Sequence, residues 1–341
     1  MNRRKFLIYN SMFFTPIPYY FKQRLYMSDI EKYDYAWDNN LRYIPQKFNT
    51  IKSLRDNKLH IHTINVAQGD STLIVTPRNK IILIDTGHAV HDGRHVINYL
   101  NEQDIDRIDY LILTHPHWDH IGGFKQIINM YENNLNGIKN IYHSGMTHNT
   151  NTYETYNNTL QNFTGNKKIV SERDNLNIDN ILFNILNPIQ GLNKDESINN
   201  NSIVVHIKYE NTSIILPSDA EKYTENRLSK KYKQDLNSDI YKVGHHGEDT
   251  STHTEFINKI DPDYAIISSA YNSRFNHPDI PVLERLSNKN IKTYWTGIHG
   301  SIVKISDGQN WNIVPQVNKT NKPLSVKKYS HINYPPHIGV K

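Results

Sequence analysis

The chain has 341 residues, no cysteine and 18 histidines, with 39 Lys and Arg against 34 Asp and Glu. The lack of cysteine excludes disulfides, thiolate metal sites and cysteine nucleophiles, so any metal must be held by His and carboxylate side chains. The net charge of +5 is concentrated in residues 1–58 and 315–341, so the middle of the chain is mildly acidic and lacks the basic footprint of a dedicated polynucleotide-binding domain.

The N-terminus, MNRRKFLIYNSMFFTPIPYYF, has a basic pair followed by a moderately apolar stretch. Within it, RRKFL resembles the core of a twin-arginine export signal, so residues 1–27 are predicted to be such a signal or a basic N-terminal arm. The protein is exported in the first case and cytoplasmic in the second. Residues 6–21 are too polar for a transmembrane helix, and no other segment reaches about 18 apolar residues, so no integral membrane domain is predicted.

Residues 28–58 form a lead-in segment without a clear period. From residue 59, short apolar runs separated by turn residues predict sheet strands, and strands and helices then alternate. An Asn- and Thr-rich stretch, 147–165, is expected to line the cleft or to form a mobile loop. The expected strands of this half are 59–66, 71–77, 80–87 and 107–114, and the expected helices are 93–104 and 121–134.

The second half of the chain repeats this order, with antiparallel strands first and alternating strands and helices afterwards. We predict an α/β fold over 59–314, a four-layer αβ/βα sandwich, followed by a basic tail at 315–341. Loops after the strands then converge at one edge, where α/β proteins bind ligands. The expected strands are 180–188, 202–210, 212–219, 239–246, 264–270 and 292–297, the expected helices are 221–232, 250–260 and 281–289, and a hairpin covers 300–314.

The densest group of ligand-type side chains is THPHWDH, between a predicted strand and a predicted helix. His115 and His117 are two residues apart, and Asp119 and His120 follow. A tight loop can point alternate side chains at two neighbouring positions, giving one cation two imidazoles and the other a carboxylate and an imidazole. We therefore predict half of a dinuclear metal site, and not a polar surface loop with accidental histidines.

The HPHWDH motif resembles the H-x-H-x-D-H motif of the metallo-β-lactamase superfamily, and the resemblance extends from Leu59 to Val314. LIDTG fits the superfamily's first motif, which implies that Asp85 supports the metal loop from a strand end. LPSD fits the fourth motif, which implies that Asp219 bridges both cations. The resemblance thus implies a metallo-β-lactamase fold with two divalent metal ions.

Two further motifs of the superfamily are less straightforward in this chain. KVGHHG fits the fifth motif, whose imidazole binds the second cation; His245 and His246 are both candidates, and we favour His246, with His245 facing the substrate. The third motif normally gives a His to the first cation, but the matching place reads NNNS, Asn199 to Ser202. The first cation then has fewer protein ligands, or an Asn or an outside His substitutes. His206 lies inside the predicted strand and is expected to be packed or to lie on the sheet face.

Within the superfamily, the chain most resembles the domain attached to the competence protein ComEC and its free-standing relatives. The match rests on NVAQGDS, the NNNS departure, LPSDAE, GHHG and SRFNHPDIPVLERL. This resemblance implies phosphodiester hydrolysis. The expected substrate is DNA or a small or cell-surface phosphodiester.

Outside these motifs, two polar residues are singled out. His277, after the strand 264–270, is expected at the same edge as the metal loops, where it binds phosphate or protonates a leaving alkoxide, or else serves as a helix-entry residue. Asp70 orients a metal ligand or forms a turn. The histidines without paired spacing are mostly expected at the surface: His60, His62, His88, His91, His95, His143, His148, His253 and His299.

The sequence therefore predicts a dinuclear metal-dependent hydrolase, with a hydroxide held between the cations and oriented by Asp119. Zinc is the favoured metal, and manganese is the second choice because carboxylate-rich sites with a missing imidazole accept harder ions. The alternatives are hydrolysis of carboxylic esters, thioesters or lactams, and a metal-bound scaffold or binding protein without catalysis. LIDTG is also similar to the signature of an aspartic protease, but the second copy that such a site requires does not occur.

Overall fold

A computed structural model describes residues 56–134, 137–192, 196–271 and 275–316 of the chain. All of them lie in the larger of the two units into which the chain divides, Tyr43–Lys341. The predicted export signal or arm, nearly all of the lead-in segment and the tail beyond residue 316 lie outside the described residues. No helix in the described ranges is long and apolar enough to cross a membrane.

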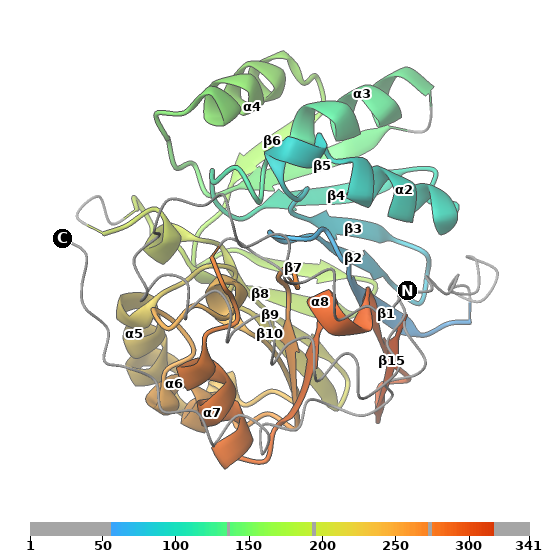
Figure 1. Cartoon of the computed structure of the whole chain (residues 1–341). Coiled ribbons are helices and arrows are strands. Elements are labelled where there is room, and N and C mark those ends of the chain that lie inside the picture. The colour runs from blue at the N-terminus through green and yellow to red at the C-terminus, as the bar shows by residue number, and fades with distance from the viewer. Residues whose placement is uncertain (1–55, 135–136, 193–195, 272–274, 317–341) are drawn as a thin grey trace, which may run out of the picture. The chain divides into compact units, whose positions relative to one another are not determined.

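The first sheet has eight strands in the order β15-β14-β1-β2-β3-β4-β5-β6 (Figure 1). β1, β2 and β3 pair antiparallel, and β3 to β6 pair parallel. The carboxyl ends of β3, β4 and β5 therefore share one edge. The strands are β1 Leu59–Thr63, β2 Thr72–Val75, β3 Ile81–Ile84, β4 Ile108–Leu113, β5 Ile138–His143, β6 Asn166–Ile169, β14 Ile302–Ser306 and β15 Trp311–Pro315.

The second sheet has seven strands in the order β13-β12-β11-β10-β9-β8-β7. β7 to β10 pair antiparallel, and β10 to β13 pair parallel. The two sheets thus share one plan, an antiparallel part followed by a parallel part, as the sequence predicts. The strands are β7 Asn175–Ile178, β8 Ile181–Asn187, β9 Val204–Tyr209, β10 Thr212–Leu216, β11 Ile240–Lys242, β12 Tyr264–Ile267 and β13 Lys292–Trp295.

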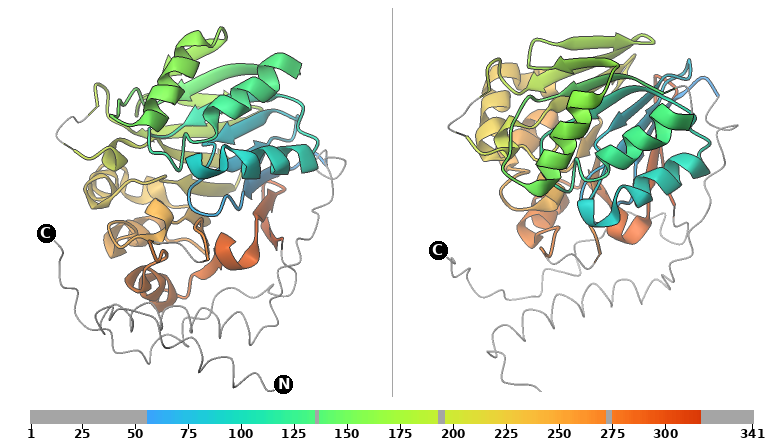
Figure 2. Two further views of the ribbon diagram at one scale, coloured as in Figure 1. Left: turned by 45° about the horizontal axis from the view of Figure 1, so that its top comes forward. Right: turned by 90° about the horizontal axis from the view of Figure 1, so that it is seen from above.

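Helices cover the outer face of each sheet (Figures 1 and 2). An apolar core that includes Ile82, Ile112 and Ile214 lies between the sheets, and a second core that includes Leu111 and Phe124 lies under the helices of the first sheet. The predicted four-layer αβ/βα sandwich is confirmed. The helices are α2 Arg94–Glu102, α3 Phe124–Asn134, α4 Asn151–Asn162, α5 Lys222–Tyr232, α6 Thr254–Ile260, α7 Ile280–Asn288 and the short α8 Thr296–His299, and the 3-10 turns are η3 Ala89–His91, η4 Asn199–Asn201, η5 Lys233–Leu236 and η6 Gly244–Gly247.

The stretch 147–165, expected to line the cleft or to form a mobile loop, contains the helix α4. The Thr150 hydroxyl accepts a hydrogen bond from the Tyr153 backbone N–H at 3.2 Å and caps the helix. Tyr156 and Leu160, four residues apart, are buried against the first sheet. The alternative of a mobile loop was wrong, because the many Asn and Thr residues hid one short apolar stripe.

The expectation that the unpaired histidines lie mostly at the surface was wrong for three of them, because His60, His62 and His299 are buried. His62 Nδ1 lies 2.7 Å from the Tyr99 hydroxyl, and burial lowers the pKa of His62 well below its usual range. Each of these three buried rings has a polar partner, as a buried polar group requires. His206 in β9 is also buried, as expected.

Candidate metal centre

The loop after β4 holds four of the predicted site residues and is fixed from beneath by Asp85. The Asp85 carboxylate accepts hydrogen bonds from the Thr114 backbone N–H at 2.8 Å and from the Thr114 hydroxyl at 2.7 Å. Its Oδ2 also lies 2.8 Å from His120 Nδ1. Because a carboxylate only accepts, His120 carries its proton on Nδ1 and turns Nε2 toward the other sheet. Asp85 thereby fixes the orientation of the His120 ring, which is buried.

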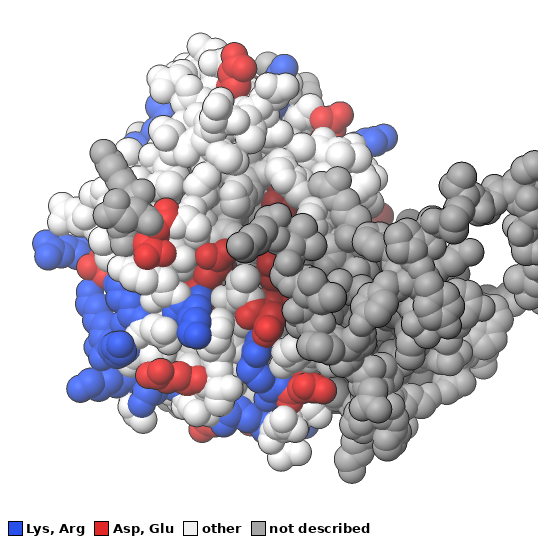
Figure 3. Space-filling view, turned by 60° about the vertical axis from the view of Figure 1, so that its left-hand side comes forward, with Lys and Arg blue, Asp and Glu red and all other residues white. Residues whose placement is uncertain are grey.

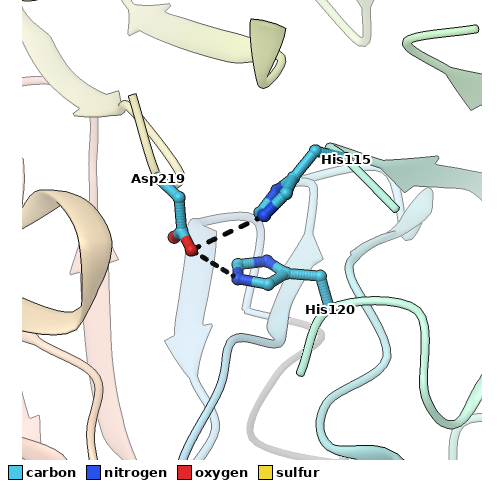
Figure 4. Close-up of side chains that lie close together, drawn as sticks. All are labelled: His115, His120 and Asp219. Atoms are coloured by element: carbon cyan, nitrogen blue, oxygen red, sulfur yellow. Dashed lines mark hydrogen bonds and ion pairs between the residues drawn. The ribbon is translucent and has the colours of Figure 1, made fainter. Parts of the chain in front are cut away.

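Asp219, in the loop after β10, is the point where side chains from both sheets meet. Its Oδ2 lies 3.1 Å from His120 Nε2 and 3.6 Å from His115 Nε2 (Figure 4). The same oxygen lies 3.4 Å from His246 Nε2, which is in turn 3.2 Å from Asp119 Oδ2. One carboxylate oxygen therefore faces imidazoles from three positions of the chain.

The rings of His245 and His246 both face the Asp219 carboxylate, and each ring is held by a different acceptor. Both residues have left-handed backbones, with φ of 46° and 57°, which is strained for non-glycine residues and separates the two rings. His246 Nδ1 donates to the Ser268 carbonyl at 3.0 Å. His245 Nδ1 lies 3.1 Å from Glu248 Oε2, and its Nε2 lies 3.8 Å from Asp219 Oδ2. Both rings thus have the arrangement of a metal-ligating His, with Nδ1 bound to an acceptor and Nε2 turned inward.

The three asparagines in the place of the third motif have different surroundings. Asn199 Nδ2 lies 3.4 Å from His245 Nε2 and 3.0 Å from Glu221 Oε1. Asn200 Oδ1 instead accepts from two backbone N–H groups at the start of α5, each at 3.2 Å, and Asn201 Nδ2 donates to a backbone carbonyl at 3.1 Å. Asn199 is therefore the one that faces the centre, while its two neighbours hold the turn.

The ionisable groups of the centre neutralise one another. Burial opposes ionisation of Asp219, but the neighbouring His120, His246 and His245 hold the pKa of its carboxyl well below its usual range. Burial likewise opposes ionisation of Asp119, yet His246 lowers its pKa to about 2.

The imidazoles respond in the opposite sense. Burial opposes protonation of His246, but the Asp219 and Asp119 carboxylates raise its pKa to about 10. Against the same cost of burial, Asp219 and Asp85 hold the pKa of His120 well above its usual range. Positive charge is thus favoured at these positions, and a divalent cation can take the place of the protons.

The donor atoms fit divalent cations. Three groups of side chains have ligand atoms within 4.8 Å of one another: His115, His120 and Asp219; Asp119, His120 and His246; and Asp70, Asp219 and His246. Within the described part of the chain, buried Asp219 Oδ1, Asp70 Oδ1 and His246 Nε2 have no hydrogen-bond partner. Buried polar atoms without partners are costly, and a cation among them satisfies them. Imidazole and carboxylate ligands suit zinc and also harder ions.

Asp70 lies behind His246 and is paired with a buried lysine. Lys242, at the end of β11, has its Nζ 2.5 Å from Asp70 Oδ2, while Asp70 Oδ1 is 3.7 Å from His246 Nδ1. Sequence reasoning considered Asp70 but missed Lys242. The available signal was a lysine inside the otherwise apolar strand IYKV, because a lysine is seldom fully buried without a partner.

Two further histidines lie beside this group. The His277 ring centroid is 6.3 Å from that of His245, and its Nε2 is 3.8 Å from Glu248 Oε2. The His148 ring, in the segment before α4, is 5.3 Å from the ring of His117. No sequence pattern marks His148, because its spacing from the motifs is irregular.

Basic and acidic side chains are mixed on the face that carries α5. In Figure 3, which brings the side of α5 forward, Lys and Arg side chains gather on one part of the face and Asp and Glu side chains lie among them. Some of the basic groups are paired: Arg227 and Lys231 of α5 lie 2.9 Å and 2.8 Å from Glu172 Oε2. This face therefore presents both signs of charge.

Comparison with known proteins connects this geometry to a family. The model of the metallo-beta-lactamase superfamily matches residues 64–270. Competence protein ComA of Neisseria gonorrhoeae is 25% identical over 251 residues, which are 74% of this chain and 33% of that protein. ComE operon protein 3 of Bacillus subtilis is 29% identical over 259 residues, 71% of this chain and 32% of that protein.

Recombination protein 2 of Haemophilus influenzae is similar to the same extent, 29% identical over 255 residues, which are 74% of this chain and 29% of that protein. The chain thus spans about a third of the length of these curated relatives. Among solved structures, the metallo-beta-lactamase fold protein YhfI of Bacillus subtilis has a TM-score of 0.49 at 12% identity, covering 73% of this chain and 100% of that chain.

Proposed function

Because the chain belongs to the metallo-beta-lactamase superfamily, whose members are mostly metal-dependent hydrolases, we propose that it is a dinuclear hydrolase of phosphodiesters. The observation that carries this proposal is the single oxygen of Asp219 that faces His115, His120 and His246. A carboxylate between two groups of ligands suits a pair of cations that clamp the attacking and leaving oxygens of a displacement. The names of the relatives, competence and recombination proteins, favour a nucleic-acid phosphodiester.

We assign the ligands of the two divalent cations, zinc first and manganese second, from the directions of the rings. Asp119, His120 and His246 would hold the second cation, His115 and His117 would hold the first, and Asp219 would be shared by both. The sequence assigns His245 to the substrate, but its inward Nε2, 3.8 Å from Asp219 Oδ2, supports a place among the ligands of the first cation, where the third-motif imidazole is missing.

The cations, when bound, lower the pKa of a water molecule and neutralise the charge that develops on the phosphate oxygens. The chain itself supplies orientation and proton transfer. Asp119 would orient the attacking water with its carboxylate. His277, beside His245, donates a proton to the leaving alkoxide. Asp85 and the Ser268 carbonyl keep the inner nitrogens of His120 and His246 turned to the centre.

The test is hydrolysis of bis(p-nitrophenyl) phosphate and of single-stranded DNA by protein loaded with Zn²⁺ or Mn²⁺. We expect metal-dependent turnover of both, lowered by at least about 100-fold in Asp119→Ala, as for loss of one preorganised catalytic group. Asp106→Ala, at an exposed aspartate, is the matched control and should keep full activity. Two bound equivalents of metal with no turnover of either substrate would contradict the proposal and favour carboxylic esters, thioesters or lactams.

A further inference from the structure

The turn 68–71, between β1 and β2, packs directly against the metal loop, residues 115–120. A Cβ atom at Gly69, whose φ is 119°, would lie 2.3 Å from the Asp119 carbonyl oxygen, so this close approach requires glycine. The Asp70 backbone N–H donates to the same carbonyl oxygen at 3.1 Å. The turn is therefore fixed against the backbone of a proposed ligand of the second cation.

The side chain of Asp70 extends from this turn to the second sheet. Its Oδ2 lies 2.5 Å from Nζ of Lys242, the last residue of β11, and both side chains are buried. Its Oδ1 lies 3.7 Å from His246 Nδ1 and, within the described ranges, is a buried oxygen without a hydrogen-bond partner. Asp70 thus adjoins a proposed ligand on each sheet, Asp119 through its backbone and His246 through its carboxylate.

The outer nitrogen of His246 is held by a segment that is bonded to the same turn. His246 Nδ1 donates to the Ser268 carbonyl at 3.0 Å. The Ser268 hydroxyl in turn donates to the Gly69 carbonyl at 2.8 Å. The turn therefore supports His246 in two ways, through Ser268 and through the Asp70 carboxylate, and a shift of the turn relative to β11 would change the direction of the ring.

A stabilising role alone does not explain why Lys242 and Asp70 are buried together. Taking two charges out of water is costly, and apolar side chains of similar volume in place of a buried ion pair often leave a protein as stable or more stable. Asp70 belongs to a group with Asp219 and His246 whose ligand atoms lie within 4.8 Å of one another, and Lys242 offsets the charge of Asp70 there. The pair thus gives the second cation a fixed neighbour without adding net charge.

We propose that Lys242 and Asp70 form a positioning pair for the second cation. Lys242 fixes the direction of the Asp70 carboxylate, and Asp70 fixes His246 relative to Asp119. This inference rests on the proposed function for the ligands of that cation, and neither residue of the pair is itself a ligand. Loss of groups that orient metal ligands typically lowers metal affinity. Because Lys242 acts through Asp70, its effect should disappear once Asp70 is replaced.

The test is binding of Zn²⁺ and Co²⁺ to the metal-free full chain. Calorimetric titration gives the affinities, and the visible absorption of bound Co²⁺ reports the geometry of its ligands. We expect Asp70→Asn to weaken the tighter cation by about 10- to 100-fold and to change the Co²⁺ spectrum. Lys242→Met should have a similar effect. The double variant, Asp70→Asn with Lys242→Met, should bind no more weakly than Asp70→Asn alone.

Asp109→Asn is the matched control. Asp109 is a buried aspartate whose Oδ1 lies 3.0 Å from Lys139 Nζ, at the end of β4 opposite the metal loop. Its replacement should lower the free energy of unfolding without changing the cation affinities or the Co²⁺ spectrum. The same result for Asp70→Asn would overturn the positioning pair, because the role of Asp70 would then be purely structural.

The double variant keeps the test decisive if Lys242→Met, which leaves a buried carboxylate without its partner, does not fold. Weaker binding by the double variant than by Asp70→Asn would overturn the pair, since Lys242 would then act independently. Cation binding also separates this inference from the proposed function. The expected losses of affinity in a protein that hydrolyses neither bis(p-nitrophenyl) phosphate nor DNA would remove the proposed function and support the pair. Unchanged affinities and spectra in a protein that hydrolyses both would overturn the pair alone.

Discussion

The two proposed cation positions differ in how completely the chain surrounds them. At the second position Asp119, His120 and His246 are all buried, and the outer nitrogens of both imidazoles are fixed by Asp85 and by a backbone carbonyl. At the first position His115 is also buried, but His117 is half-buried and the side chain of His245 is 16% exposed.

From this difference we infer that the two cation positions have different roles. Ligands that are buried and held from behind cost little to organise when a cation binds, so the second position should hold its cation tightly. The first position, with Asn199 where the superfamily resemblance expects an imidazole, is the more open one and is the place for a substrate oxygen. Asp219 and Asp119 connect the two positions, because Asp219 is the proposed shared ligand and Asp119 the proposed ligand that orients the water.

The largest effect should come from Asp219→Ala, which removes the feature that both positions share. Loss of this shared oxygen would leave each cation short of a ligand. It also removes the carboxylate that His120 Nε2 contacts at 3.1 Å and that His246 Nε2 faces at 3.4 Å. We expect metal content to fall from two equivalents to fewer than one, and activity to fall about a thousand-fold, which corresponds to several kcal/mol.

Metal content after gel filtration and initial rates measure this outcome. Asp235→Ala, at an exposed aspartate on η5, serves as the control for loss of a carboxylate elsewhere. If Asp219→Ala kept two equivalents of metal at unchanged affinity, the two positions would not share a ligand, and the comparison between them would have no basis.

A smaller effect should separate the two positions. His245→Ala should weaken binding of one cation by about 100-fold, in the range seen when groups that support metal ligands are lost, and leave the other bound. Asn199→His in that background should restore binding to within about ten-fold. The reason is that Asn199 Nδ2 lies only 3.4 Å from His245 Nε2, so an imidazole at residue 199 reaches the same neighbourhood.

Calorimetric titration of the metal-free variants measures both affinities. Asn199→Gln in the same background is the matched control, since it changes size without adding an imidazole, and it should not rescue binding. If His245→Ala instead bound two cations normally but turned over slowly, His245 would face the substrate, as the sequence favours, and the first position would be open by one more ligand.

The same contrast explains which parts of the site the sequence predicts. The ligands of the metal loop are recognisable because all four come from one short segment with a fixed spacing. Asp219 and the GHHG pair are recognisable because each directly follows an apolar strand. The direction of His245 is not readable, since it depends on two successive left-handed residues that Gly244 and Gly247 flank.

The fold also contains elements that could not be predicted from the sequence. Most buried strands were predicted from their apolar runs, but β5, β6 and β7 were missed. All four residues of β6 are exposed, and only some residues of β5 and β7 are buried, so no continuous apolar run marks these strands. The Lys242–Asp70 pair is buried and was also missed. The two residues are far apart in the sequence, so nothing in the sequence indicates that they pair with each other.

The smallest effect, and the finest test of the comparison, is the pH dependence of cation binding. At the second position the pKa of His246 is raised to about 10 and that of His120 is also raised, so a cation must displace their protons. At the first position, burial lowers the pKa of His115 and His117, so these imidazoles are already neutral near pH 7. Raising the pH therefore strengthens binding at the second position, by about ten-fold per pH unit for each proton displaced, and changes the first very little.

Titrations of Zn²⁺ in buffers of different ionisation enthalpy count the protons released, and chelator competition at pH 6.5 and 7.5 gives the affinities. We expect release on binding of the tighter cation and little on binding of the weaker one. His206→Gln, at a buried histidine whose pKa burial lowers to about 3, changes a neutral imidazole of the second sheet and should leave the count unchanged. Equal proton release at both positions would mean that the carboxylates charge all four imidazoles alike, and the difference between the positions would then lie in solvent access alone.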